Sequence, residues 1–491
     1  MSNPPDTINA VERWLQAPPP ESPFEEIEAL RSHLLALGDL RAPPGVILRV
    51  IEGLHVRAQS AIEAIAPKLY SVKLPVSLNT RQTVRFMQDA LEALIRLSLD
   101  LAEAPDSQLV KGLGTPVDIA IWRILHAIGR QILLSDLTAS PVAPGTWLSL
   151  HRAYLAARRH RVENRVPTGA QYSLQSLYAR ISLLGALPVS ALSAQEWSCA
   201  YRLALRVPFE AVVTDSEPDA DQGAILWITP ELDNPPVHFD RKAPTEGALT
   251  LFILYRGLDD AFSRLIAPAE GGRPPAGLLP DDISPRTAAI AMKRIRDYLR
   301  SPKKRRFPRR RQGYRATLSF GLPDTVHLLK TRSDSEIDLS EWMIVNESPG
   351  GYAAMHVSGK PRKVQVGDLI GLLREGSRDW SICIVRWALS ENHEHLELGL
   401  QEVSPKVTYA RLATPGHVGA EELPALLLPA FPPLRTADAI AFAPGHRPAD
   451  GHKHLIVIGG TSTQVREFKL GETIEQSLDV EIALISYDVP I

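Results

Sequence analysis

The sequence has few of the features that mark secreted or membrane-spanning proteins. Only two cysteines occur, Cys199 and Cys383, and neither belongs to a CxxC pair. This argues against a disulfide framework and against a zinc ribbon, and a reducing cytoplasm is the simplest compartment. No uncharged apolar run of about 18 residues occurs, so we expect no membrane insertion. The polar N-terminus, Met1–Asp6, does not have the pattern of a signal peptide.

Recognisable catalytic motifs are also missing. The sequence contains no GxSxG and no HExxH, so no catalytic residue can be assigned. His393-Glu394-His395 resembles a metal-binding pair, but it precedes a strand in a polar turn and has no third ligand nearby. Gly459-Gly460 follows a strand without the Gly-Lys of a phosphate loop. We therefore expect no metal, no cofactor and no enzymatic activity.

Charge is nearly balanced along the whole chain. The 54 basic and 56 acidic residues give a net charge of -2, which gives no overall signal for nucleic acid. The hydrophobic fraction of 44% and the charged fraction of 22% are ordinary for a globular protein. At roughly 100–200 residues per domain, 491 residues predict about three domains.

Proline-punctuated segments with helical periodicity fill residues 1–206. Apolar residues recur at every third or fourth position, as in amphipathic helices, and no fixed repeat period is present. We predict helices over 23–37, 45–65, 81–101, 117–134, 147–160, 171–184 and 193–205.

The pattern changes near Pro208. Residues 209–213 and 224–228 have the β-branched and aromatic content of short strands. The Pro- and Gly-rich stretch 267–280 predicts a linker, and Ser284-Pro285 predicts the start of a helix. Residues 207–300 are therefore predicted to be a mixed α/β segment.

From about residue 315 the apolar residues alternate with polar ones, which is typical of a β-barrel or sandwich. A second β-rich stretch begins near Leu423 and continues to the end. The expected fold class is an α+β multidomain protein: a helical region over 1–206, the mixed segment over 207–300, a barrel over 301–405 and a β-rich part over 406–491.

A dense basic cluster precedes the predicted barrel. Eight of the thirteen residues from 303 to 315 are Lys or Arg. Such a cluster attracts phosphate, and on composition alone it indicates a solvated linker or a nonspecific nucleic-acid patch. Arg311-Gln-Gly-Tyr-Arg315 is an RxxxR motif that leads directly into a strand. Arg305-Arg-Phe-Pro-Arg309 is a second RxxxR motif, and we favour the first because of the strand that follows it.

A second polar motif follows the next predicted strand, where Asn346-Glu-Ser348-Pro-Gly-Gly351 forms a turn. The RxxxR motif and this (D/N)xSxxG motif together resemble the signature of the PilZ family. The resemblance continues at Val366-Gly-Asp368, Ile384-Val-Arg-Trp387 and Leu396–Gln401, in the order of the family. It covers about a fifth of the chain, approximately residues 305–405.

The resemblance implies that the barrel binds cyclic di-GMP. Arg311 and Arg315 would contact guanine and phosphate, because a planar guanidinium donates to both and stacks on bases. Asn346 and Ser348 would hydrogen-bond the ligand from the other side, and Gly351 would allow its close approach. Arg310 would stack on a second guanine if two ligand molecules bind together.

The resulting interpretation is a cyclic di-GMP receptor that regulates an unidentified protein partner through its helical N-terminal region. Ligand binding would neutralise the arginine segment and order it against the barrel, which would reorient the preceding helix. The alternative is an interaction or chaperone-like scaffold whose barrel binds no ligand. A nucleic-acid binder that uses residues 303–315 is a further alternative, and it predicts strongly salt-dependent binding.

Overall fold

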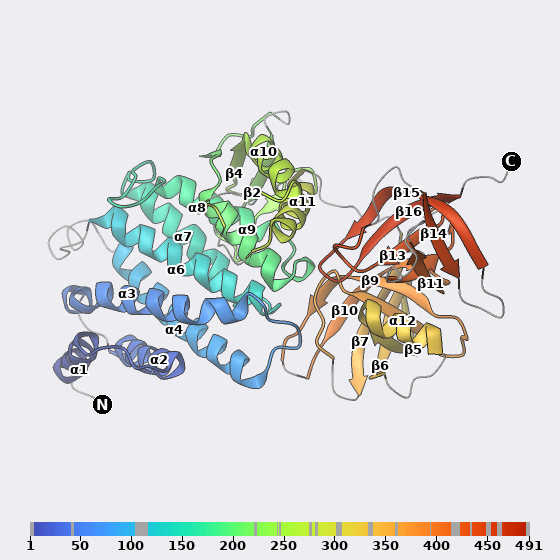
Figure 1. Cartoon of the computed structure of the whole chain (residues 1–491). Coiled ribbons are helices and arrows are strands. Elements are labelled where there is room, and N and C mark those ends of the chain that lie inside the picture. The colour runs from blue at the N-terminus through green and yellow to red at the C-terminus, as the bar shows by residue number, and fades with distance from the viewer. Residues whose placement is uncertain are drawn as a thin grey trace. The chain divides into compact units, whose positions relative to one another are not determined.

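A computed structural model gives the fold (Figure 1). It describes most of the chain. Outside the described residues are 1–3, 41–43, 104–115, 220–222, 243, 245–246, 274–276, 280–282, 301–306, 332–336, 359–361, 393, 414–422, 433–434, 448–452, 459–463 and 488–491.

The chain forms two compact parts. The N-terminal part comprises Met1–Val72 and Val76–Lys303, and the barrel part comprises Lys73–Pro75 and Lys304–Ile491. Helices dominate the first part and strands the second (Figure 1). The predicted α+β class, with a helical region ahead of a barrel and a further β-rich part, is confirmed.

Each of the seven helices predicted in the first 206 residues is present. An additional helix, α1 Pro4–Gln16, precedes them. The predicted helices are α2 Pro23–Asp39, α3 Pro44–Leu69, α4 Leu78–Ala102, α6 Val117–Leu137, α7 Thr146–Arg159, α8 Leu174–Gly185 and α9 Ala194–Arg206. Serine caps fix several starting points, because a side-chain oxygen accepts from an otherwise unpaired backbone N–H. At α9, Ser193 and Glu196 form a complete capping box.

A four-stranded sheet follows the helices and packs on the same hydrophobic core. Its strands are β1 Glu210–Thr214, β2 Ala224–Ile228, β3 Val237–His238 and β4 Leu251–Arg256, in the order β1-β4-β2-β3. Helices α10 Leu258–Glu270 and α11 Pro285–Arg300 lie beside it (Figure 1). The linker predicted over 267–280 is wrong at its start, because α10 continues through Pro268 to Glu270. The start of α11 agrees with its prediction.

The first barrel is closed and has six strands. They are β5 Arg310–Phe320, β6 Ser340–Ser348, β7 Gly351–Ser358, β8 Leu369–Arg374, β9 Ser381–Leu389 and β10 Glu397–Ser404, in the order β10-β7-β6-β5-β8-β9. Helix α12, Gly321–Thr331, stands between β5 and β6, and it was not predicted from the sequence.

The second barrel repeats the strand path of the first. Its strands are β11 Thr408–Ala413, β12 Leu423–Leu428, β13 Ala439–Phe442, β14 Lys453–Ile458, β15 Gln464–Gln476 and β16 Glu481–Tyr487, in the closed order β11-β12-β13-β16-β15-β14. When β5 to β10 are matched one by one with β11 to β16, each strand has the same two neighbours in both closed barrels. The barrel part therefore contains two copies of one topology.

The two barrels share a hydrophobic core. Leu322 and Val326 of α12 pack with Ile384 of the first barrel and with Leu426 and Ile482 of the second, all of them buried. Burial of such side chains stabilises the contact by about 25 cal/mol for each Å² removed from water. The second barrel is consequently a fixed neighbour of the first.

Candidate functional site

The turn between β6 and β7 carries the predicted polar motif. Ser348 and Gly351 are paired across the hairpin, and Ser348 Oγ donates to the Gly351 carbonyl at 3.4 Å. Gly351 has φ of +143°, and a Cβ there would lie 1.9 Å from the carbonyl oxygen of Leu400. Only glycine fits this position, because any side chain would collide with the backbone of β10. The tight turn fixes the position of Ser348.

A pocket of about 150 Å³ opens at this turn. It is lined by Arg309, Ser348, Gly350, Gly351, Tyr352, Arg386, Trp387, Gly399, Leu400 and Gln401. Two arginines and no acidic side chain belong to this set, and one of them, Arg386, is ion-paired with Glu475 of β15. Its volume suits one base or one phosphate group, and a larger ligand would extend beyond it.

Arg309 reaches the pocket through the segment that precedes β5. The neighbouring Phe307 approaches the turn, because its Cδ2 lies 3.4 Å from the point where a Cβ on Gly350 would be. Residues 307–309 therefore lie against the β6–β7 turn. Arg309 belongs to the second of the two RxxxR motifs, and Arg305, the first residue of that motif, lies outside the described residues.

The three predicted arginines lie along β5 and do not line the pocket. Arg310 and Arg311 are exposed and pair with Glu347 and Asn346 of β6. Arg315 pairs with Met343, and its Nη1 donates to Glu341 Oε2 at 3.1 Å. The structure thus brings Ser348 and Gly351 together with Arg309, while Arg310, Arg311 and Arg315 flank the motif along the strand.

Asn346 has an unsatisfied polar atom. Its Oδ1 is buried and has no hydrogen-bond partner among the described residues. A buried acceptor without a partner costs about 1–3 kcal/mol. Asn346 is not among the residues that line the pocket, so the structure does not bring this predicted residue together with Ser348 and Gly351 there.

Two further pocket residues come from β9. Arg386 Nε donates to Gln401 Oε1 at 2.6 Å, which holds its guanidinium along the pocket wall. The indole of Trp387 lies over Gly399, where a Cβ would be 1.7 Å from Nε1. A half-buried indole of this kind is a surface on which a base can stack.

Sequence reasoning placed Arg386 and Trp387 in a strand of the resembling family and did not assign them to the site. Their membership depends on the pairing of β9 with β10, which no local pattern reveals. The glycine at position 399, in a strand of large apolar residues, was the available signal, because an internal strand glycine indicates a close approach by another group.

Glu347, the acidic residue within the motif, accepts hydrogen bonds from neutral donors. Glu347 accepts from Tyr314 Oη at 2.7 Å and from Gln312 Nε2 at 3.0 Å. Burial raises the pKa of Tyr314 above its ordinary range, and the hydrogen bond to Glu347 raises it further. Tyr314 therefore stays protonated and keeps donating to Glu347.

Other candidate sites receive no support. Within the described residues, no group of three or more His, Cys, Asp and Glu side chains is arranged to hold a metal ion. His393 lies outside those residues, and His395 Nε2 lies 3.2 Å from Glu397 Oε1. No helix in the described part of the chain combines the length and apolarity needed to cross a bilayer.

Comparison with known proteins gives three matches. Residues 9–215 match the family model described as the N-terminal domain of the cyclic-di-GMP receptor FimW. Residues 324–408 match the model described as its middle PilZ domain. The cyclic-di-GMP receptor FimW of Pseudomonas aeruginosa is 34% identical over 90 residues, which are 18% of this chain and 15% of that protein.

The two family matches lie in the two compact parts that the structure separates. The middle PilZ match ends at residue 408, where the first barrel gives way to the second. With helices, first barrel and motif turn in the expected order, the chain resembles the PilZ-containing family that these models describe over residues 9–215 and 324–408.

Proposed function

We propose that this chain is a cyclic di-GMP receptor whose ligand binds at the β6–β7 turn of the first barrel. The observation that carries the proposal is the pocket in which Arg309 and Arg386 meet Ser348 and Gly351. Cyclic di-GMP has two phosphates and two guanines, and arginine forks recognise both. The matched receptor is named for this ligand.

The pocket residues and the polar residues around them have separate roles in this model. Arg309 donates to a phosphate or to the O6/N7 edge of guanine, and Arg386, held by Gln401 and Glu475, forms the wall beside it. Ser348 Oγ and the orphaned Asn346 Oδ1 serve the ligand from the β6 side. Trp387 offers a face for stacking. Arg310, Arg311 and Arg315, which are exposed along β5, form an outer ring of positive charge for the rest of the ligand.

In this proposal, the ligand signals by ordering the basic segment that precedes β5. Residues 301–306 connect α11 to the pocket segment and lie outside the described residues. Two phosphates would neutralise the basic segment and draw it onto the barrel, which would change how the helical part meets a protein partner. The partner's identity and the regulated process are not part of the proposal.

The test is isothermal titration of the full chain with cyclic di-GMP. Saturable binding is expected for the wild type, with at least tenfold weaker binding for Arg309→Ala and Ser348→Ala. The matched control is Arg378→Ala, which removes the same charge from the exposed β8–β9 turn and leaves affinity unchanged.

The outcomes separate the alternatives. A wild type that binds no cyclic di-GMP would favour a scaffold with a ligand-free barrel. Tight binding to single-stranded RNA that survives Ser348→Ala and falls steeply with salt would favour a nucleic-acid binder. Hydrogen exchange that detects no ligand-dependent protection of residues 301–315 would contradict the ordering step alone.

A further inference from the structure

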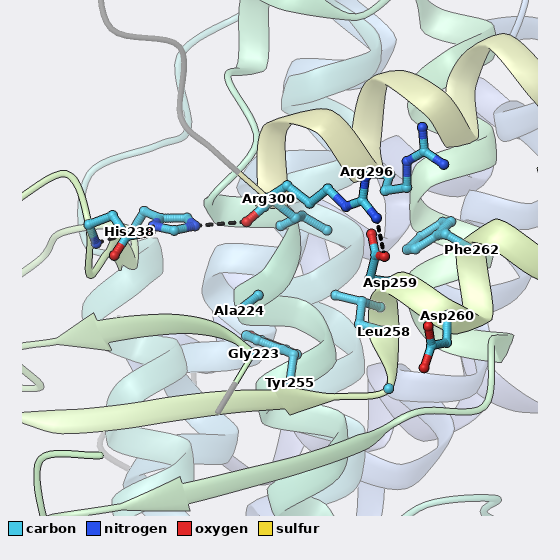
Figure 2. A pocket seen from close by; sticks show the side chains of 13 residues that line it. Gly223, Ala224, His238, Tyr255, Leu258, Asp259, Asp260, Phe262, Arg296 and Arg300 are labelled. Atoms are coloured by element: carbon cyan, nitrogen blue, oxygen red, sulfur yellow. Dashed lines mark hydrogen bonds and ion pairs between the residues drawn. The ribbon is translucent and has the colours of Figure 1, made fainter. Parts of the chain in front are cut away.

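Two pockets of the N-terminal part differ in the charges that line them. The larger, of about 270 Å³, lies beside α10 and α11, where Arg300 pairs with Asp259 (Figure 2). Its lining also holds a buried donor, Arg296 Nε, and a buried acceptor, Asp259 Oδ1, that have no hydrogen-bond partner among the described residues. Because one of these groups donates and the other accepts, they select no class of ligand. The smaller pocket has no such balance.

The smaller pocket, of about 150 Å³, is lined by residues of α3, α4 and α6. All of these residues belong to one compact part. Trp122, His126 and Arg130 of α6 line it, and their spacing of four residues places them on one face of that helix. A cavity of this size can hold one benzene-sized ring.

Apolar side chains make up much of this lining. Ile62, Leu91 and Leu94 line the pocket and are each at most 2% exposed. The indole of Trp122 lies against the His126 ring, with the ring centroids 4.0 Å apart, and both residues are partly exposed. The pocket therefore offers apolar and aromatic surface to the body of a small molecule, as most ligand sites do.

The two histidines of the lining carry no charge at neutral pH. Burial lowers the pKa of His55 to about 3, with a smaller effect of Arg123. Burial likewise lowers the pKa of His126 to about 4, and Arg130 adds to the shift. His55 Nε2 lies 2.9 Å from Ser98 Oγ, and it donates there because the Ser98 hydroxyl donates its own hydrogen to the Leu94 carbonyl. The positive charge of the pocket therefore comes from its arginines alone.

Arg123 and Arg130 are the charged residues of the lining, and no Asp or Glu belongs to its described residues. Arg123 donates to Glu52 Oε1 at 2.8 Å, and Glu52 is 56% exposed and lies outside the lining. The guanidinium carbon of Arg130 lies 5.3 Å from the Tyr201 ring centroid, and no carboxylate in the described part of the chain pairs with it. A planar guanidinium in this state suits a carboxylate, which accepts two parallel hydrogen bonds from it.

From this lining we infer that the pocket among α3, α4 and α6 binds a small organic carboxylate whose apolar body is about one ring in size. The carboxylate accepts from Arg130, and the body packs on Leu91, Leu94 and the Trp122 indole. A cationic ligand is disfavoured because both arginines repel it. The inference does not depend on cyclic di-GMP binding, because this pocket and the pocket at the β6–β7 turn share no residue.

The probe is benzoate, compared with benzamide and benzamidine, which have the same ring with neutral and cationic heads. Ligand-observed NMR titrations of the full chain at neutral pH give the three affinities. Benzoate is expected to bind saturably and about tenfold tighter than benzamide, because only the carboxylate forms a charge-assisted pair with arginine. Benzamidine is expected not to bind.

Four variants locate the binding site. Arg130→Gln removes the charge and should weaken benzoate binding about tenfold, whereas Arg130→Lys keeps the charge and should recover part of that loss. Arg85→Gln removes an arginine from the exposed face of α4, outside the lining, and as the matched control it should have no effect. Ala127→Leu adds bulk to the lining and should also weaken binding. Circular dichroism of each variant confirms that the fold is kept.

Three results would overturn the inference. They are the absence of saturable benzoate binding, equal affinities for benzoate and benzamide, and undiminished binding by both Arg130→Gln and Ala127→Leu.

A chain that carries Arg309→Ala and Ser348→Ala separates this inference from the proposed function. It should bind benzoate as the wild type does, and cyclic di-GMP should not displace the benzoate. Displacement in this variant would show that the nucleotide itself occupies the helical pocket, which would also overturn the inference. The failure of benzoate would leave the cyclic di-GMP titration unaffected, so the two proposals fail separately.

Discussion

Arg386 in β9 of the first barrel donates to Glu475 in β15 of the second, with Nη1 to Oε1 at 2.9 Å and a further contact through Nη2. Glu475 is almost buried, with 9% of its side chain exposed, and Arg386 is 36% exposed. The second barrel therefore holds an arginine that lines the pocket of the first. Through this contact, the second barrel fixes the position of a residue that lines the pocket of the first barrel.

Replacing Arg386 should destabilise the contact between the barrels. Arg386→Met removes the bidentate cationic partner of Glu475. Leaving a buried carboxylate without a partner lowers the free energy of unfolding. Because Arg386 is partly exposed, we expect a loss of about 2 kcal/mol, below the range for fully buried pairs. Hydrogen exchange of the full chain should then be faster in β9 and β15.

The double variant Arg386→Met, Glu475→Leu provides the control for that prediction. It removes both charges and should restore most of the lost protection, since no unpaired carboxylate remains. Slower exchange in the single variant than in the wild type would contradict the assigned role of the pair.

Gly351→Ala should damage the β6–β7 turn. The added Cβ would lie 1.9 Å from the Leu400 carbonyl, and the positive φ adds strain. We expect a loss of about 3 kcal/mol, measured as a lower thermal midpoint. Gly313→Ala is the matched control, because no atom lies within 4 Å of a Cβ there. Equal effects of the two variants would show that the turn tolerates a side chain.

Arginine substitutions will show which RxxxR motif binds. Arg309 lines the pocket, whereas Arg315 is engaged with Glu341 on the exposed face of β5. We expect Arg309→Ala to weaken cyclic di-GMP binding at least tenfold and Arg315→Ala to weaken it less than threefold, with Arg311→Ala between them. The reverse order in calorimetry would support the motif that was favoured from the sequence.

The second barrel should bind no cyclic di-GMP. Its β12–β13 connection reads Pro429-Ala-Phe-Pro-Pro-Leu-Arg-Thr-Ala-Asp438, which has no (D/N)xSxxG motif. The residues that precede β11, Ser404-Pro-Lys-Val407, contain no arginine pair. Ser348→Ala combined with Arg309→Ala should therefore abolish all binding. Residual saturable binding in that variant, detected by calorimetry, would place a second site in this barrel.

Local patterns were sufficient for much of the fold. The predicted helices end within a few residues of the observed ones because amphipathic periodicity and serine caps act locally. Helix α10 was missed because Pro268 and the glycines after it resemble a linker, although tertiary packing of Phe262 and Ile266 keeps the helix in place. Strand β4, whose residues are almost all buried, has no alternation to reveal it.

The site was predictable only in part. Ser348 and Gly351 stand in a contiguous motif, and the turn that joins them is local. Arg386 and Trp387 reach the pocket through the β9–β10 pairing, and Arg309 reaches it through the path of residues 307–309. The spacing of residues in the sequence does not predict either of these arrangements. The Arg386 contact with Glu475 joins residues 89 positions apart, and sequence patterns contain no information about it.

Asp368, which directly precedes β8, should make the stability of the barrel part depend on pH. Burial raises the pKa of Asp368 to about 7, and neighbouring Asp479 adds to the shift while Lys73 opposes it. Asp368 Oδ2 accepts from the Gln365 N–H at 2.9 Å. That hydrogen bond favours the ionised carboxylate and offsets part of the rise in pKa, but burial is the larger effect.

The sign follows from the raised folded-state pKa. Between the ordinary value of 3.8 and about 7, the unfolded chain loses this proton while the folded chain keeps it. Stability contributed by the protonated form is therefore lost as pH rises through this window. Asp368→Asn cannot ionise, so it should stabilise the barrel part on the order of 3 kcal/mol at about pH 8 and have little effect near pH 4.

Differential scanning calorimetry of the full chain at several pH values provides the measurement. The thermal transition of the barrel part should move upward in Asp368→Asn relative to the wild type, and the gap should widen as pH increases. Asp379→Asn, in the exposed β8–β9 turn, is the control and should show no such widening. A gap that stays constant across the range would mean that Asp368 ionises freely in the folded barrel.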